Sequence, residues 1–263
     1  MNTPVQIAEK YSGIAEKKVA MSFGKTLVLA ILAGAFIALA GIGCTISPVT
    51  VASASVAKLL GASIFPAGLV MVIIAGSELC TGNNLLVLPL LEGRVRLGSV
   101  LRNWGIVYLG NLIGAVAVAF FATYGGTFAL FDKAAAASIV SIGQAKVSLT
   151  FLQAFLKGLL CNFLVCIAVW MAFAAESVPG KVMVVFFPIM MFVLCGYEHS
   201  IANMYFIPAA IFTADLYGMD PGVLGWGSFF LKNLLPVTLG NLVGGGVCVA
   251  GSYWFIYGKR KSA

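Results

Sequence analysis

The only histidine of the chain, His199, lies beside Glu198 in the apolar stretch CGYEHSIANM at residues 195–204. An ionisable group in such a segment is costly to bury, and it normally faces a partner or a water-filled cavity. With no second histidine and no cysteine at ligand spacing, the pattern does not favour a metal or haem site. Imidazole can hydrogen-bond a solute or exchange a proton with it near neutral pH. We expect one of these roles for His199; the alternative is a neutral buried histidine that only satisfies its own hydrogen bonds.

The elements that must position His199 are membrane spans. The 263 residues are 61% hydrophobic and 10% charged, which is far more apolar than a soluble domain. About 20 apolar residues cross a bilayer as a helix. We expect one membrane domain with six crossings, of which the second and fifth are broken: 25–47, 59–91, 99–125, 148–175, 182–213 and 228–257. The remaining segments are expected to be an amphipathic surface helix at 1–24, a connection at 126–147 and a tail at 258–263.

The distribution of basic residues predicts the orientation. Most lysines and arginines fall in the segments that share a side of the membrane with the amino terminus, such as Lys17, Lys25, Arg94 and Arg102. Basic segments stay in the cytoplasm, so we expect a multi-pass protein of the cell membrane with both termini cytoplasmic. The formal charge of +7 then follows from topology and requires no nucleic-acid partner.

Two pairs of segments repeat within the chain. LRNWGIVYLGNLIGA at 101–115 aligns without a gap with LKNLLPVTLGNLVGG at 231–245, so the third and sixth spans match. GSELCTGN at 76–83 likewise matches GYEHSIAN at 196–203, in the second and fifth spans. Because each half has three spans, the second half must enter from the opposite face, and the repeats are inverted. Such repeats place a solute path near the midplane, where interrupted helices meet.

The interruptions combine Gly, an acid and Asn in the middle of apolar sequence. A helix broken in the membrane exposes backbone groups that only protein or a water-filled cavity can satisfy. The freed amides at half-helix ends create a weak positive potential that suits a small anion. The glycines of GNLIGA and GNLVGGG, in contrast, are typical of close helix packing.

At GSELCTGN, FLKGLLCNFLVCIAVWMA, CGYEHSIANM and LPVTLGNLVGGG the sequence resembles the formate/nitrite transporter family, over essentially the whole chain. The resemblance implies an all-α integral membrane protein with an aquaporin-like protomer of six transmembrane helices, the second and fifth interrupted. It also implies a homopentamer with one pore in each protomer. Members of the family move small monovalent anions of weak acids, such as formate, nitrite or hydrosulfide, often with a proton.

The resemblance also assigns candidate residues. It implies solute contact at His199 and Thr81, polar support from Asn162, Asn203, Asn241 and Glu198, apolar constrictions at Leu79 and Phe192 on one side and Phe65 on the other, and vestibule lysines at Lys146 and Lys18. Lys157 of the FLKG segment has no fixed role in the family. A buried ammonium should pair with a carboxylate or line a wet cavity, and we favour the pairing.

The acids and lysines allow two interpretations each. Charged carboxylates facing the path would repel an anion, so we expect Glu198 and Glu78 to accept hydrogen bonds from freed amides or from Asn162, Asn203 and Asn241. Lys146 and Lys18 precede the first span of their halves and could be ordinary interfacial lysines. Alternatively, one at each mouth raises the local concentration of the anion.

The residues favour transport of a weak-acid anion, with formate as the first choice of substrate and nitrite or hydrosulfide next. Removing a bare anion from water costs more free energy than hydrogen bonds to one side chain recover. We therefore expect the anion to bind near Thr81 and His199 and to cross the constriction after protonation. The alternative is an aquaporin-like channel for water or glycerol, although the paired Asn-Pro-Ala loops are absent. An enzyme is not expected, because no catalytic set and no cofactor motif is present.

Overall fold

The protein was analysed as a computed structural model, which describes residues 1–258. Of the expected tail at 258–263, only Gly258 belongs to the described residues. The first half of the chain forms α1 (Pro4–Ala20), α2 (Phe23–Ile46), α3 (Ala54–Ile64), α4 (Pro66–Ala75), η1 (Gly82–Leu86), α5 (Val87–Leu91) and α6 (Leu97–Tyr124). The second half forms η2 (Thr127–Ala129), α7 (Ala134–Val147), α8 (Phe151–Ala174), α9 (Val178–Leu194), α10 (Ser200–Tyr217), α11 (Trp226–Ser228), η3 (Phe229–Leu234), α12 (Leu235–Leu242), η4 (Val243–Gly251) and α13 (Ser252–Tyr257).

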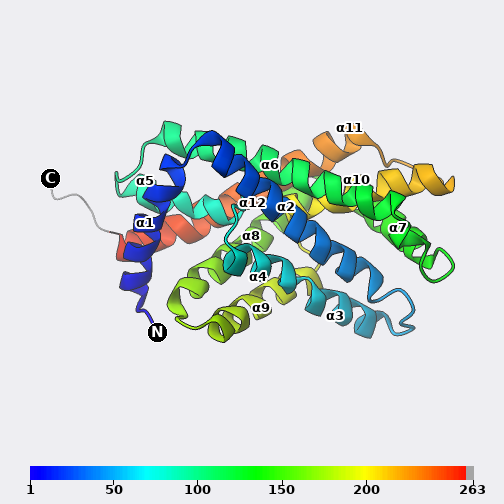
Figure 1. The fold of residues 1–263 in the computed structure, drawn as a ribbon, viewed down its shortest axis with the longest axis horizontal. Coiled ribbons are helices and arrows are strands. Elements are labelled where there is room, and N and C mark those ends of the chain that lie inside the picture. Colours follow the sequence, from blue (N-terminus) through cyan, green and yellow to red (C-terminus); the bar gives the residue numbers. More distant parts are fainter. Residues whose placement is uncertain (259–263) are drawn as a thin grey trace.

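The spans follow the expected pattern. Between residues 1 and 258, five helices are long and apolar enough to cross a membrane: Phe23–Ile46, Ala54–Ala75, Leu97–Tyr124, Phe151–Ala174 and Trp226–Tyr257. The segment expected as the fifth span is divided into α9 and α10, which meet near the centre of the molecule (Figure 1). The all-helical membrane fold is therefore confirmed.

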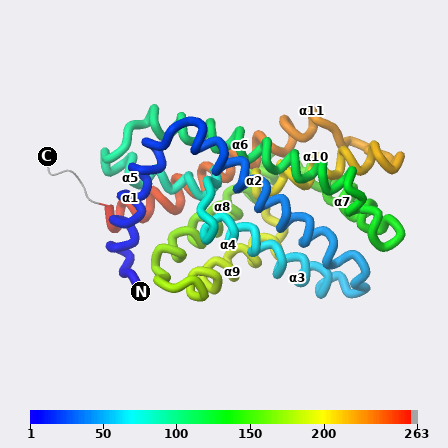
Figure 2. Tube along the Cα trace, viewed as in Figure 1, coloured from blue at the N-terminus to red at the C-terminus, as the bar shows by residue number. Residues whose placement is uncertain are grey.

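Both predicted helix breaks are present, and glycine ends the first half-helix of each. Gly76 caps α4 with φ 78°, and Gly196, just after α9, has φ 68°. Both angles are left-handed, a conformation that glycine adopts without the steric cost of a Cβ atom. The chain then continues through Ser77–Thr81 to η1 and through Tyr197–His199 to α10. Figure 2 shows α4 and α9, which are in contact, side by side close to these breaks.

The connection expected at 126–147 contains a helix that the sequence analysis did not predict. This helix, α7, packs against α10 and leads into α8, just as α1 leads into α2. Each half of the chain is therefore one leading helix followed by three spans. Lys18 and Lys146 lie in the last turns of the two leading helices.

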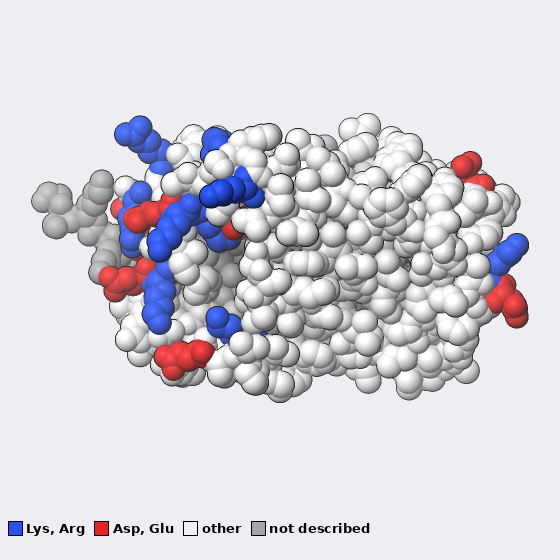
Figure 3. All heavy atoms as spheres, viewed as in Figure 1, with Lys and Arg blue, Asp and Glu red and all other residues white. Residues whose placement is uncertain are grey.

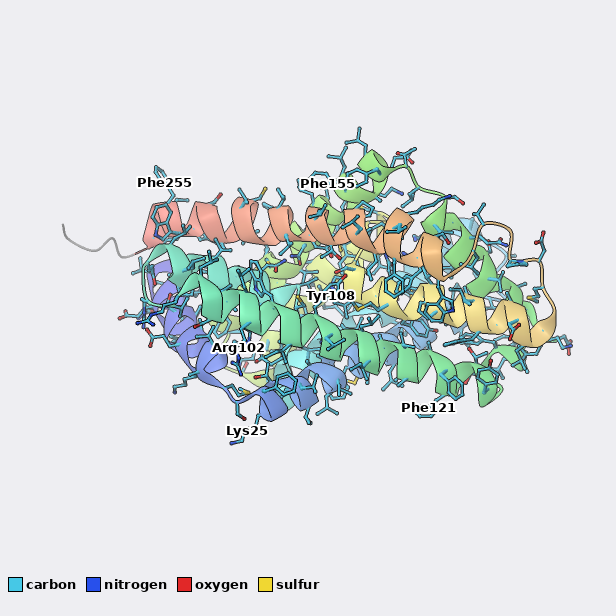
Figure 4. All side chains as sticks on the ribbon, turned by 90° about the horizontal axis from the view of Figure 1, so that it is seen from above. Lys25, Arg102, Tyr108, Phe121, Phe155 and Phe255 are labelled. Carbon is cyan, nitrogen blue, oxygen red and sulfur yellow. The ribbon has the colours of Figure 1, made fainter. Side chains whose placement is uncertain are left out.

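The inverted repeat is visible as a contact between equivalent residues. Tyr108 on α6 aligns with Thr238 on α12 in the gapless match of the third and sixth spans. Their hydroxyl groups hydrogen-bond to one another at 2.8 Å. Only residues close to a pseudo-twofold axis can meet their own repeat equivalents, so the axis passes between α6 and α12, where Figure 4 shows Tyr108.

The two ends of the molecule differ in charge. Lysines and arginines gather at the end where α1, α5 and the beginning of α6 lie, and most of the visible face is uncharged (Figure 3). We call this end the basic end and the opposite one, where α7 and the end of α10 lie, the far end. The amino terminus and the end of α13 both lie at the basic end (Figure 1). A wide uncharged belt is what a protein surrounded by lipid requires.

Glycines allow the spans to pack at backbone contact. A Cβ atom at Gly114 would overlap the carbonyl oxygen of Ile31 on α2, and one at Gly244 would overlap that of Leu159 on α8. We expect Gly114→Ala to lower the free energy of unfolding by about 1–3 kcal/mol, because overpacked cores must shift backbone. Thermal unfolding in detergent measures the effect. Gly105→Ala on the same helix meets open space, and an equal loss there would contradict the packing argument.

Candidate functional site

The two breaks bring Thr81 and His199 into contact at the centre of the molecule. Thr81 precedes η1, and His199 precedes α10 as its N-cap residue. The Thr81 Oγ1 and His199 Nε2 atoms are 2.9 Å apart, and each residue is only 2% exposed. The family resemblance selected the two residues separately, and the fold brings them together although they are 118 residues apart in the chain.

The hydrogen bonds of His199 define the direction of this contact. The Ala202 amide donates to His199 Nδ1 at 3.1 Å, so Nδ1 carries no proton in that bond. A neutral ring then has its proton on Nε2, and His199 donates to Thr81 Oγ1. The hydroxyl proton of Thr81 is left available for another acceptor, such as an anion.

Two vestibules approach this pair from opposite ends. The basic-end vestibule has a volume of about 420 Å³, and its lining includes Lys17, Lys18, Glu78, Leu79 and Lys181. The far-end vestibule has a volume of about 250 Å³, and its lining includes Lys58, Phe65, Lys146, Phe192 and His199. Apolar side chains also line both vestibules, among them Leu69 and Val72 at the basic end and Phe206 at the far end.

The apolar constrictions are arranged differently from the expectation. Leu79 lines the basic-end vestibule with Leu69 and Val72. Phe192 and Phe65 both line the far-end vestibule, and their rings are 5.7 Å apart in an edge-to-face contact. The expected placement of Phe192 with Leu79, opposite Phe65, is therefore wrong, because Phe65, at the junction of α3 and α4, meets Phe192 of α9. Phe192 also stacks on the His199 ring at 5.8 Å.

A buried polar cluster holds the break of the second repeat. Lys146 Nζ lies 3.0 Å from Glu198 Oε1 and 3.1 Å from Oε2. Asn203 donates to Glu198 Oε2 at 2.7 Å and to Asn233 Oδ1 at 2.7 Å. The expectation that the Glu198 carboxylate accepts hydrogen bonds is confirmed for Asn203, but Asn162 and Asn241 do not donate to it.

The first repeat contains the same cluster. Lys18 Nζ lies 2.8 Å from Glu78 Oε1. Asn83 donates to Glu78 Oε2 at 2.7 Å and to Asn103 Oδ1 at 2.9 Å. Each acid is therefore neutralised by the lysine of its leading helix, because the inverted repeat copies the whole arrangement. Lys18 and Lys146 lie at the mouths as expected, but both are paired.

Asn241 and its repeat equivalent Asn111 connect each break to the neighbouring spans. Asn241 Oδ1 accepts the Ser200 amide at 2.9 Å, while its Nδ2 donates to the carbonyl groups of Gly158 and Glu198. Asn111 likewise accepts the Cys80 amide and donates to the carbonyl groups of Ala30 and Glu78. These side chains satisfy backbone groups that the helix breaks leave without partners.

Of the two candidate residues on α8, Asn162 hydrogen-bonds within the site, whereas the expected ion pair of Lys157 is not found in residues 1–258. Asn162 is buried and donates to the carbonyl groups of Thr81 and Asn241, so it supports the loop that carries Thr81. Lys157 is half-buried, and no ion pair connects it to a carboxylate anywhere in residues 1–258. The expected pairing of Lys157 is therefore wrong within that range.

Four further asparagines belong to the site although the sequence analysis did not select them as site residues. They are Asn83, Asn103, Asn111 and Asn233. The signal was present, because each lies at a repeat position whose partner also is asparagine. Buried asparagines conserved between two halves of one chain indicate a hydrogen-bond network that both halves need.

The lysine-acid pairs give a testable stability effect. Replacing Lys146 with Met leaves the Glu198 carboxylate 5% exposed without its cation, which we expect to cost about 3 kcal/mol of unfolding free energy. Adding Glu198→Gln should recover part of this loss, because the double variant removes the unpaired charge. Thermal unfolding of the single and double variants measures the coupling. Strictly additive losses would contradict a direct pairing.

The fold and the site define a class of protein: a multi-pass membrane channel or transporter with inverted repeats, broken helices and one polar contact between two vestibules. Comparison with known proteins then identifies the family. The formate/nitrite transporter family model matches residues 5–255. The chain belongs to this family.

Individual relatives agree along nearly the whole chain. A probable formate transporter of Methanothermobacter thermautotrophicus is 40% identical, over 98% of both chains. The formate channel FocA of Haemophilus influenzae is 36% identical, over 94% of this chain and 92% of that one. A solved pentameric formate channel with formate bound is 39% identical with a TM-score of 0.80, over 90% and 98% of the two chains. These relatives are channels and transporters, so this protein is a membrane transporter and not an enzyme.

Proposed function

We propose that this protein carries formate across the cytoplasmic membrane, passively or with a proton, through one path in each protomer of a homopentamer. The observation that carries the proposal is the Thr81–His199 contact at 2.9 Å between two vestibules. The formate channels among its relatives support the substrate, and the pentameric relative supports the assembly. Nitrite and hydrosulfide are the next candidate substrates.

The mechanism that we propose separates binding from crossing. An anion enters a vestibule and accepts the free hydroxyl proton of Thr81 in a hydrogen bond, as His199 donates to the same oxygen. The apolar side chains Leu79, Phe65 and Phe192 make passage of a bare ion expensive. Protonation of the anion removes most of that cost, so the neutral acid crosses. The proton comes from His199 or from water in the vestibule.

The basic end faces the cytoplasm in this proposal. Basic residues near span ends remain on the cytoplasmic side, and they gather at the end of the molecule that holds α1 (Figure 3). The two termini are then cytoplasmic. The uncharged belt contacts lipid, and the substrate and protons are the only small-molecule partners that the path needs.

Uptake into proteoliposomes tests the function. Formate uptake should exceed that of protein-free vesicles and rise as external pH falls, because acid shifts formate toward its neutral form. Glycerol should not enter, and osmotic swelling in glycerol measures this directly. Swelling in glycerol without formate uptake would favour the aquaporin-like alternative. Competition by nitrite, hydrosulfide, acetate and lactate would rank the substrates.

A further inference from the structure

The lysines that line the two vestibules differ in whether a neighbouring carboxylate neutralises their charge. Lys18 and Lys146 are each within 3.0 Å of a buried carboxylate, so each pair contributes almost no net charge to its vestibule. Two other lysines line the same cavities: Lys58 lines the far-end vestibule and Lys181 the basic-end vestibule. Neither has an ion-pair partner within the part of the chain that the structure describes.

The charged groups of each vestibule can be compared directly. In the far-end vestibule they are Lys58, Lys146 and Glu198, with His199, Cys44 and Tyr197 as further titratable groups. Removing the Lys146–Glu198 pair leaves Lys58, which is exposed, as the net charge of that lining. In the basic-end vestibule they are Lys17, Lys18, Lys181 and Glu78, with Tyr11 as a further titratable group. Removing the Lys18–Glu78 pair leaves Lys17, which is exposed, and the half-buried Lys181.

Lys58 and Lys181 also lie near the starts of corresponding helices, although the alignment of Gly76 with Gly196 pairs Lys58 with Val178, three residues before Lys181. Lys58 is the fifth residue of α3, and Lys181 is the fourth residue of α9. These two helices are the first halves of the two broken spans, and they begin at opposite ends of the molecule. The start of a helix favours negative charge, so neither lysine stabilises its helix. Both line a vestibule instead.

We propose that Lys58 and Lys181 are the residues that concentrate the anion at the far-end and basic-end mouths, whereas Lys18 and Lys146 act as structural counter-ions of the acids. An unpaired ammonium in a narrow, low-dielectric funnel raises the local concentration of small anions, and a neutralised one does not. The proposal rests on the anion transport proposed above and adds the residues that set its rate at low substrate concentration.

Raising the salt concentration on one side of the membrane tests the proposal. Salt screens exposed charges, and the Debye length is about 10 Å at 0.1 M. The protein is reconstituted in one orientation, and formate influx is measured as salt is raised from about 0.01 M to about 0.5 M on one side at constant osmolarity. For the wild type we expect a loss of roughly two- to threefold from either side. Lys58→Gln should abolish the sensitivity to far-end salt only, and Lys181→Gln should reduce the sensitivity to basic-end salt only, because Lys17 remains in that lining. Lys58→Arg should keep the wild-type response.

Two lysines provide matched controls at other helix starts. Lys25 is the third residue of α2 at the basic end and points away from the bundle (Figure 4). Lys133 is the N-cap residue of α7, with its ammonium 5.5 Å from the Tyr217 ring centroid. Neither lines a vestibule, and their Gln variants should retain the salt response.

The outcomes separate this proposal from the proposed function. Wild-type protein that does not transport formate would refute the function. Wild-type transport without any salt response would overturn the role of these lysines. This measurement uses only the wild-type protein, so it does not depend on whether a variant folds. A Lys58→Gln response equal to that of Lys133→Gln would overturn it as well. A lost response that Lys58→Arg restores supports the assignment.

Discussion

Thr81→Val is expected to reduce formate flux by roughly 10- to 100-fold, because it removes the hydroxyl group with little change in shape. A hydrogen bond to a charged group contributes about 1.5–3 kcal/mol, and about 1.4 kcal/mol corresponds to a tenfold change in rate. Because the Ala202 amide donates to His199 Nδ1, the neutral ring donates from Nε2 to Thr81 Oγ1, which leaves the threonine proton free for the anion. Flux of labelled formate into proteoliposomes measures the loss.

Thr81→Ser is the matched control, since serine keeps the hydroxyl group. Its flux should stay within a few-fold of the wild type. Thr81→Ser should unfold at the wild-type temperature, because the Thr81 backbone carbonyl group still accepts from Asn162 and Cys166. Thr81→Val leaves the buried His199 Nε2 without its acceptor, which should cost about 1–3 kcal/mol. Undiminished flux in Thr81→Val would remove the hydroxyl from the mechanism.

Asn241→Leu is expected to have the largest effect on stability, about 3–5 kcal/mol. The Asn241 side chain makes three hydrogen bonds to backbone groups, two at the second break (Ser200 and Glu198) and one on α8 (Gly158). Leucine leaves the Ser200 amide and the Glu198 carbonyl group without these partners inside the protein, and each unsatisfied buried group costs about 1–3 kcal/mol. The midpoint of thermal unfolding in detergent should fall steeply.

The repeat supplies a second variant for the same prediction. Asn111→Leu removes the equivalent three bonds at the first break and should be about as destabilising. Leu239→Ala, on the same helix as Asn241 but 41% exposed, should change the unfolding midpoint little. A small effect of both asparagine variants, comparable to that of Leu239→Ala, would show that water satisfies the broken ends.

The sequence predicted the parts of the fold that depend on apolar length and on repetition. Six spans, two breaks and their inverted relation follow from hydropathy and from matched segments. The helix α7 was missed because an alanine-rich segment of 14 residues between two spans is shorter than a crossing. Its equivalence to α1 became clear only from the matched ion pairs of Lys18 with Glu78 and of Lys146 with Glu198.

The site was predictable in composition but not in pairing. His199 and Thr81 were selected on residue type and family motif, and they do meet. The partners of Lys18 and Lys146 could not be read from the sequence, because Lys146 and Glu198 are 52 residues apart and meet only through the packing of α7. The placement of Phe192 depended in the same way on the contact between α4 and α9. Hydropathy gives the position of a residue along a span, but not the direction in which it faces.

Simultaneous measurement of formate, protons and charge tests the central claim most directly. In proteoliposomes with a pH-sensitive dye inside, neutral passage predicts internal acidification in step with formate uptake, with no effect of an imposed membrane potential. Protein-free vesicles and Thr81→Val correct for acid that crosses the lipid. A formate current that follows the membrane potential without acidification would show that the bare anion crosses, and it would contradict the account.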